Sequence, residues 1–220
     1  MISKNKIVTL ISFVAAFLVI AVLVKTQNSF LINIDGKVAV LFGSIHFNFL
    51  DKAMLLITKL CDTHESLYIF IIFGMFLIVK RKKYSLYNLA LAIILGISLS
   101  EIIKILIERT RPVSNLLIET GFSFPSNHAT ISTIFLLSSI LLIVPLIKNN
   151  LLKNTFLIAT MILFSLVALS RIYLQVHFAS DVLAGVFLGI ISYIISDIII
   201  SKYSLHNTEK SVINKVHDRN

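Results

Sequence analysis

Six long runs of apolar residues, separated by short polar stretches, dominate the chain. A helix that spans a bilayer needs about 20 mainly apolar residues, with a range of roughly 17 to 25, and every run meets or approaches that length. The runs cover residues 7–24, 66–79, 86–107, 129–147, 155–172 and 181–200. The pattern therefore predicts an all-α integral membrane protein with six transmembrane helices in a bundle. Residues 1–220 form one membrane-embedded domain in this interpretation, with a core at about 66–200 and a polar, frayed cytoplasmic tail at 201–220.

The N-terminal part of the chain is less regular. The first run, residues 7–24, is longer than the roughly 7 to 15 apolar residues of a signal peptide, and no small-residue cleavage site follows it, so we expect an uncleaved span. Residues 29–60 are mixed in character. Asp35-Gly36 indicates a turn there. Residues 47–60 fit an amphipathic helix near the membrane interface.

Composition supports the membrane assignment. Hydrophobic residues make up 57% of the chain, charged residues only 14%, and the mean hydropathy is +0.92; a soluble domain has about 25% charged residues. The net charge of +9 does not indicate a nucleic-acid partner, because the basic residues punctuate the ends of the apolar runs instead of forming one basic face. The single cysteine, Cys61, excludes an internal disulfide and a cysteine metal cluster, and we assign it no role.

The distribution of lysine and arginine predicts the orientation of the bundle. Cytoplasmic loops carry an excess of these residues. With six spans and both termini in the cytoplasm, twelve of the 20 fall inside. The eight outside are Lys25, Lys37, Lys52, Lys59, Lys104, Arg109, Arg111 and Arg171. We therefore expect a multi-pass protein of the plasma (inner) membrane.

Three polar motifs stand at the ends of apolar runs, and this topology places all three on the outer or periplasmic face. They are Lys104 with Arg111-Pro112, Pro125-Ser126-Asn127-His128, and Ser170-Arg171 with His177 and Asp181. Ionisable groups at such positions are costly and are functional candidates by default. Two histidines, three cations, a hydroxyl and a carboxylate brought together would form a metal-free site for cleaving a phosphate ester, so no cofactor is expected.

The spacing within the first two motifs supports this chemistry. Lys104 and Arg111 are seven residues apart, so both can lie on one face of a helix that Pro112 ends. Pro125 suits a first helical turn, and the free N–H groups of a helix N-terminus can cradle phosphate, where His128 could donate a proton. Taken alone, the first motif also fits a snorkelling lysine and an arginine that caps a helix, and the second also fits an ordinary helix start.

The third motif and two glycines concern the last span. If that helix begins near His177, the spacing of four places His177 and Asp181 on one face, where the carboxylate can orient the ring. A lone His–Asp pair is more often a structural hydrogen bond; the neighbouring cations favour a nucleophile and its orienting partner. Gly185 and Gly189 form a G-x-x-x-G pattern that predicts close helix packing.

At these residues the sequence resembles the type 2 phosphatidic acid phosphatase superfamily of membrane lipid phosphatases. Its three motifs occur here in the same order, with Asn127 in place of the usual glycine of Pro-Ser-Gly-His. The resemblance implies that His177, oriented by Asp181, attacks phosphorus to form a phosphohistidine, and that His128 protonates the leaving group. It also implies that the phosphoryl oxygens are held by Lys104, Arg111, Ser126, the Asn127 backbone and Arg171. If the glycine serves a positive-φ backbone, asparagine is among the least costly replacements.

The expected substrate is a phosphorylated membrane lipid in the bilayer. Undecaprenyl pyrophosphate, phosphatidylglycerol phosphate and phosphatidic acid all fit this chemistry, as monoester or pyrophosphate. Two alternatives remain open: a lipid phosphotransferase that uses the same phosphohistidine, and a non-catalytic transporter or binding protein for phosphorylated lipid.

Overall fold

The structure is a computed structural model that describes residues 4–60 and 62–217; Cys61 and the last three residues of the expected tail lie outside the described residues. The chain folds into α-helices joined mostly by short connections, with a long one at residues 108–126 between α5 and α6. In order they are α1 (Lys4–Lys25), α2 (Ser29–Gly43), α3 (Asn48–Lys59), α4 (Thr63–Val79), α5 (Lys83–Ile107), α6 (Asn127–Ser138), the π-helical turn η1 (Ser139–Ile143), the 3-10 turn η2 (Val144–Leu146), α7 (Asn150–Tyr173) and α8 (Ala179–His217).

Within the described ranges, five helical segments are long and apolar enough to cross a membrane. They correspond to the first, third, fourth, fifth and sixth predicted spans, and the fourth combines α6 with η1 and η2. Helix α4 coincides with the second predicted span but has only 17 residues, of which Glu65–Val79 are apolar. The apolar helical bundle is thus established, and the sixth crossing stays a prediction.

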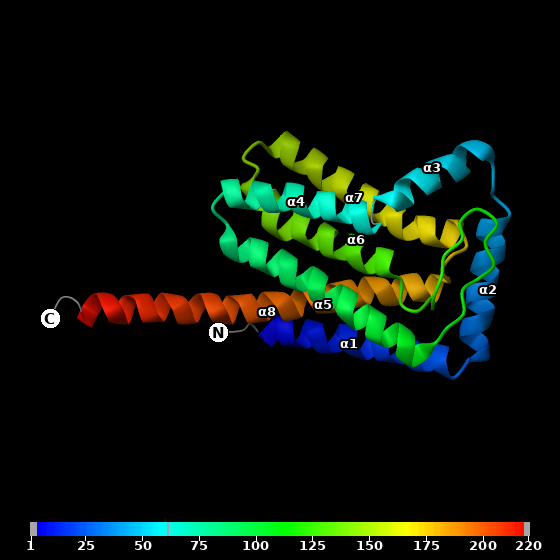
Figure 1. The fold of residues 1–220 in the computed structure, drawn as a ribbon, viewed down its shortest axis with the longest axis horizontal. Helices are drawn as coiled ribbons and strands as arrows, with labels where there is room; N and C mark the ends of the chain where they lie inside the picture. Colours follow the sequence, from blue (N-terminus) through cyan, green and yellow to red (C-terminus); the bar gives the residue numbers. More distant parts are fainter. Residues whose placement is uncertain (1–3, 61, 218–220) are drawn as a thin grey trace.

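Helix α6 lies at the centre of the bundle and packs against α5, α7 and α8 (Figure 1). Helix α1 packs along α8, and α4 lies beside α5. Helices α2 and α3 gather at the end of the bundle opposite the start of α1 and the end of α8; we call this the α2 end (Figure 1). The motif residues lie in the connections α5–α6 and α7–α8 and in the helix turns that adjoin them, which are also at this end. The three motifs therefore share one end of the fold.

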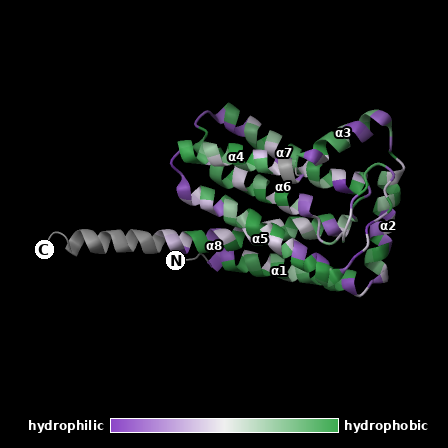
Figure 2. Cartoon of the chain, viewed as in Figure 1, coloured by the Kyte–Doolittle hydropathy of each residue, from purple (hydrophilic) through white to green (hydrophobic). Residues whose placement is uncertain are grey.

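The packing is that of a protein in lipid. Large apolar side chains such as Val79 and Leu151 are exposed on the outside of the bundle, and Figure 2 shows hydrophobic helices with polar residues concentrated at the helix ends. The interior is rich in small residues. A Cβ on Gly185 would lie 2.5 Å from the backbone oxygen of Ser126, and one on Gly189 would lie 2.7 Å from that of Thr130. The close α6–α8 packing predicted from the G-x-x-x-G pattern is therefore present.

Three local predictions were wrong. Asp35-Gly36 is not a turn but lies inside α2, which begins where the side chain of Asn28 accepts hydrogen bonds from the backbone N–H groups of Phe30 and Leu31. The tail does not fray at residue 201, because α8 continues to His217 and projects beyond the bundle (Figure 1). Helix α6 begins at Asn127 with Ser126 as its N-cap, so Pro125 precedes the helix and is not in its first turn.

Candidate active site

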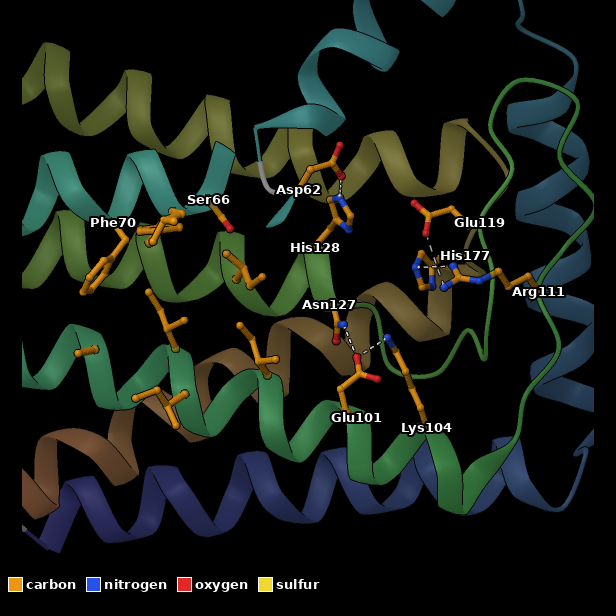
Figure 3. Close-up of a pocket in the computed structure, with 17 residues that line it drawn as sticks. Asp62, Ser66, Phe70, Glu101, Lys104, Arg111, Glu119, Asn127, His128 and His177 are labelled. Carbon is orange, nitrogen blue, oxygen red and sulfur yellow. Dashed lines mark hydrogen bonds and ion pairs between the residues drawn. The ribbon is translucent and has the colours of Figure 1, made fainter. Parts of the chain in front are cut away.

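A cavity of about 860 Å³ opens among α4, α5 and α6 toward the α2 end (Figure 3). Its polar end contains motif residues from four separate parts of the chain. Those residues are Lys104, Arg111, Asn127, His128 and His177. Its other end is apolar and runs along the helices, lined by Leu67, Phe70, Ala90, Ile93, Ile94, Ile97, Ile131 and Phe135. The cavity therefore joins a charged pocket to a hydrophobic channel.

The first motif reaches the cavity from a helix and a loop. Lys104 lies in the last turn of α5, and its Nζ donates to Oε1 of Glu101 at 2.9 Å. The helix ends at Ile107, because Glu108 adopts the left-handed conformation with φ of 57°. Arg111 therefore stands in the following loop, and the expectation that Lys104 and Arg111 share one helical face was wrong. The loop nevertheless returns Arg111 to the same cavity.

The guanidinium of Arg111 is held by the loop around it. Its Nε donates to the carbonyl of Gly121 at 3.1 Å, and its NH2 donates to that of Thr120 at 3.2 Å. Its NH1 donates to the carbonyl of Val176 and lies 3.0 Å from Nε2 of His177. These bonds fix the arginine fork at the polar end of the cavity.

The second motif forms the start of α6. The Ser126 side chain is fully buried and caps the helix by accepting from the N–H of Ala129, and it does not line the cavity. Asn127 is the first helical residue and does not need the positive φ that glycine allows. Its side chain bonds to α5, donating to Glu101 at 2.6 Å and accepting from Ser100. His128 Nε2 lies 2.7 Å from Oδ1 of Asp62, just before α4.

The third motif places His177 in the lining of the cavity and Asp181 beside it, completely buried and outside the lining. Helix α8 begins at Ala179, so His177 lies in the preceding connection, and its Nδ1 is 3.7 Å from Oδ2 of Asp181. Its Nε2 faces Arg111, and because a guanidinium can only donate, Nε2 is the unprotonated nitrogen. Nδ1 then carries the proton on the side of Asp181. Burial lowers the pKa of His177 to about 4, despite the opposing effect of Asp181, so the ring is neutral at physiological pH.

Arg171 lies behind the pocket. It is completely buried and does not line the cavity. Its NH1 donates to Oγ1 of Thr58 at 2.5 Å and its NH2 to Oε1 of Glu119 at 2.5 Å, while its Nε has no hydrogen-bond partner in the described part of the chain. Burial alone would raise the pKa of Glu119, but Arg171 and Arg111 hold that pKa below its ordinary value, so Glu119 is ionised.

Acidic residues paired with the site cations were largely missed by sequence reasoning. Glu101 lies at helical spacing from Lys104, which allows their pairing, whereas no pattern in the sequence points to Asp62 or Glu119. Asp35 and Arg109 were also overlooked, and both belong to a buried network at Asp181. A signal for Asp35 was present, because an acidic residue within an apolar run requires a partner. Nothing in the local pattern identified those partners.

The arrangement can bind and transfer a phosphoryl group. A neutral imidazole directs its unprotonated nitrogen into a pocket that also holds Lys104 and Arg111, two basic side chains suited to phosphoryl oxygens. A second imidazole, His128, lies across the same pocket beside a carboxylate that can orient it (Figure 3). Two imidazoles and two cations thus lie around one space, which is the set of groups that phosphoryl transfer without a metal requires.

Comparisons with known proteins found related sequences and similar folds. The sequence profile of the PAP2 superfamily matches residues 85–203. The chain is 30% identical over 164 residues to phosphatidylglycerophosphatase B of Bacillus subtilis strain 168, covering 72% of this chain and 77% of that protein. Its fold resembles the crystal structure of a transmembrane PAP2-type phosphatidylglycerolphosphate phosphatase from Bacillus subtilis, with a TM-score of 0.77, 26% identity and coverage of 88% and 96% of the two chains. It also shares the fold of Aquifex aeolicus LpxE, with a TM-score of 0.57, 23% identity and coverage of 73% and 92%.

Proposed function

This chain belongs to the PAP2 superfamily, and on that premise we propose that it is a membrane lipid phosphatase that cleaves a phosphate monoester or pyrophosphate through a phosphohistidine on His177. One observation carries the proposal. The unprotonated Nε2 of His177 faces a pocket that contains both Lys104 and Arg111 and continues into an apolar channel. A phosphorylated lipid has the same two parts, a charged head and an apolar chain.

Each motif residue has a role in this mechanism. His177 attacks phosphorus, and Asp181 stabilises the positive charge that the ring gains. Lys104 and Arg111 bind the phosphoryl oxygens and offset a phosphomonoester charge of about −1.5 to −2. Ser126 and Asn127 supply the helix N-terminus and its backbone N–H groups, which favour an anion. Arg171 backs the pocket, and its buried Nε has no hydrogen-bond partner among the residues that the structure describes.

Proton transfer falls to His128. When charged, its imidazole donates a proton to the leaving oxygen, and when neutral, it activates the water that hydrolyses the phosphohistidine. A hydrogen bond with His128 holds the pKa of Asp62 below its ordinary value, so this carboxylate stays ionised. The positive charge for the transition state comes from protein cations, so the mechanism requires no metal.

The apolar channel indicates where the lipid chain lies. Phe70 of α4 and Ile93, Ile94 and Ile97 of α5 line it, and it leads from the phosphate pocket into the bilayer-facing part of the bundle. Burying one CH₂ group contributes about 0.8 kcal/mol, so several buried methylenes would anchor the substrate firmly. Lipid phosphates are therefore favoured over short water-soluble esters.

The direct test is to trap the intermediate. Purified protein is mixed with a ³²P-labelled lipid phosphate, quenched, and analysed for acid-labile, base-stable label, while phosphate release is measured over a panel of lipid mono- and pyrophosphates. We expect label on the native chain and on His46→Ala, whose ring lies outside the cavity beside Asp51. His177→Ala should show neither label nor turnover. Turnover by His177→Ala would remove the nucleophile assignment, and a product that depends on an added acceptor would indicate a phosphotransferase.

We further propose that all 220 residues form one domain of the plasma membrane with six spans and that the α2 end faces outside. The motifs share this end, and the excess of lysine and arginine belongs to the other. In sealed vesicles of known orientation, an impermeant phosphate ester should be hydrolysed only from the side to which the α2 end is exposed. Hydrolysis from the side of the termini alone would reverse the orientation.

A further inference from the structure

A buried charge network lies directly behind Asp181. Arg109, in the loop after α5, donates from NH1 to Oδ1 of Asp181 at 2.6 Å and from NH2 to Oδ2 of Asp35 at 2.6 Å. Asp35 comes from α2, and both carboxylates are almost completely buried. One guanidinium therefore bridges two acidic side chains from helices that are distant in sequence.

Arg109 does not belong to the substrate pocket. It lines a separate cavity of about 530 Å³ together with Asp35 and Phe178, whereas Arg111, two residues later, lines the catalytic cavity. Its guanidinium carbon lies 4.2 Å from the centre of the Phe178 ring, next to His177 in sequence. Arg109 therefore lies outside the catalytic cavity, and it touches the His177–Asp181 pair through the Asp181 carboxylate.

The network determines how the Asp181 carboxylate is rotated. The last torsion of an aspartate is broad and roughly two-fold, so the side chain alone does not fix it. Here Oδ1 is held by Arg109, and Oδ2 accepts from the backbone N–H of Phe178 at 2.9 Å, leaving Oδ2 as the oxygen that faces Nδ1 of His177. Loss of Arg109 would free the carboxylate to turn and would leave two buried negative charges without their cation.

Asp35 fixes the network to the first turn of α8. Its Oδ1 accepts from the backbone N–H of Ser180 at 3.0 Å, and its Oδ2 accepts from the Ser180 hydroxyl at 2.5 Å. Phe178, which precedes α8, has no side-chain oxygen with which to cap the helix, so Asp35 supplies the missing cap from α2. The same carboxylate thus holds both Arg109 and the helix that contains Asp181.

We infer that Arg109 is a positioning residue for the nucleophile, which holds Asp181 against His177, and that Asp35 of α2 anchors Arg109 and balances its charge. This inference rests on the proposed phosphohistidine mechanism. The charged groups facing the His177–Asp181 pair are Arg111 of the loop, Arg171 of α7 and, through Arg109, Asp35 of α2.

The test compares pH profiles of kcat/KM on a single lipid phosphate, so that the ionisation of the substrate is common to all variants. Arg109→Gln should lower kcat about 100-fold with little change in KM, because the carboxylate turns out of place. The acid limb of the kcat/KM profile of Arg109→Gln should also move to higher pH by about 1 pH unit or more, because two neighbouring carboxylates that lack their cation take up a proton more readily. Arg109→Lys keeps the charge and should leave the limb near its native position.

The sign of the charge effect separates this inference from simple destabilisation. Asp35→Asn alone should not move the acid limb of the kcat/KM profile to higher pH. In the double variant Arg109→Gln with Asp35→Asn, the limb should return toward its native pH, because only one of the two buried carboxylates then remains. Matched controls are Arg81→Gln in the exposed α4–α5 turn and Asp197→Asn near the middle of α8, whose partner is Lys6 of α1. Apparent melting temperatures in detergent report folding.

An Arg109→Gln enzyme with an unmoved acid limb would overturn the inference, whether its activity is unchanged or uniformly reduced. A failure of the underlying mechanism is distinguishable, because the native enzyme would then hydrolyse no lipid phosphate or carry no label on His177. If Arg109→Gln does not fold, Arg109→Lys and Asp35→Asn still decide: an acid limb raised in either variant contradicts the proposed charge balance.

Discussion

Gly185 sets the distance between α6 and α8 and, with it, the geometry of the candidate site. A Cβ at this position would lie 2.5 Å from the backbone oxygen of Ser126 and 2.8 Å from Cβ of Ala129. Neither atom belongs to a flexible side chain, so the clash cannot be relieved by a rotamer change. To regain an ordinary contact of 3.4 Å, the two helices must separate locally by about 0.9 Å.

That separation would act on the motif residues themselves. The N–H of Ser126 donates to the carbonyl of Asp181 at 3.1 Å, so the start of α6 is joined to the start of α8 near Gly185. Moving them apart displaces His128 relative to His177. A misplacement of about 1 Å can cost roughly 100-fold in rate, and we expect a loss of that size in kcat/KM for Gly185→Ala.

The effect on stability should be smaller. Overpacking costs about 1–3 kcal/mol, and replacing a helical glycine by alanine returns about 1 kcal/mol, so the net loss is at most about 2 kcal/mol. The matched control is Gly36→Ala in α2, where an added Cβ meets nothing within 4 Å; it should stabilise the fold and leave activity unchanged. Lipid phosphate hydrolysis and thermal unfolding in detergent check both variants. Native activity in Gly185→Ala would refute the close-packing argument.

Three further predictions concern the chemistry. Asp181→Asn should lower kcat by about 10⁴-fold while substrate binding persists, because the ring loses its orienting charge; near-native kcat would contradict the role of the dyad. Hydrolysis should continue in excess EDTA and be inhibited by vanadate, because Lys104 and Arg111 supply the positive charge; activity lost in chelator and restored by a divalent cation would disprove this. The pH profile of kcat/KM should be bell-shaped, and because burial lowers the pKa of His177 to about 4, the limb that reflects protonation of His177 should lie near pH 4, far below 6.5. A His177-dependent limb near 6.5 would mean that the ring is solvated.

The sequence alone determined the class of the protein and located its three motifs. Apolar runs of spanning length predict helices without reference to the rest of the chain, because lipid requires each segment to satisfy its own backbone hydrogen bonds. The three motifs could also be recognised locally, and their common position at one end followed from counting spans. Residue types and spacing were sufficient for both conclusions because the information lies within about ten residues.

Tertiary structure decided how the charges are paired. Arg111 reaches the pocket from a loop, since Glu108 ends α5 in a left-handed conformation four residues before the proline. Asp35, interpreted from sequence as part of a turn, caps a helix that begins about 145 residues later in the chain. A buried charge must find a partner wherever the fold places one, and no local pattern specifies which one. The anchoring of Asp181 by Arg109 therefore became visible only when helices remote in sequence were brought together.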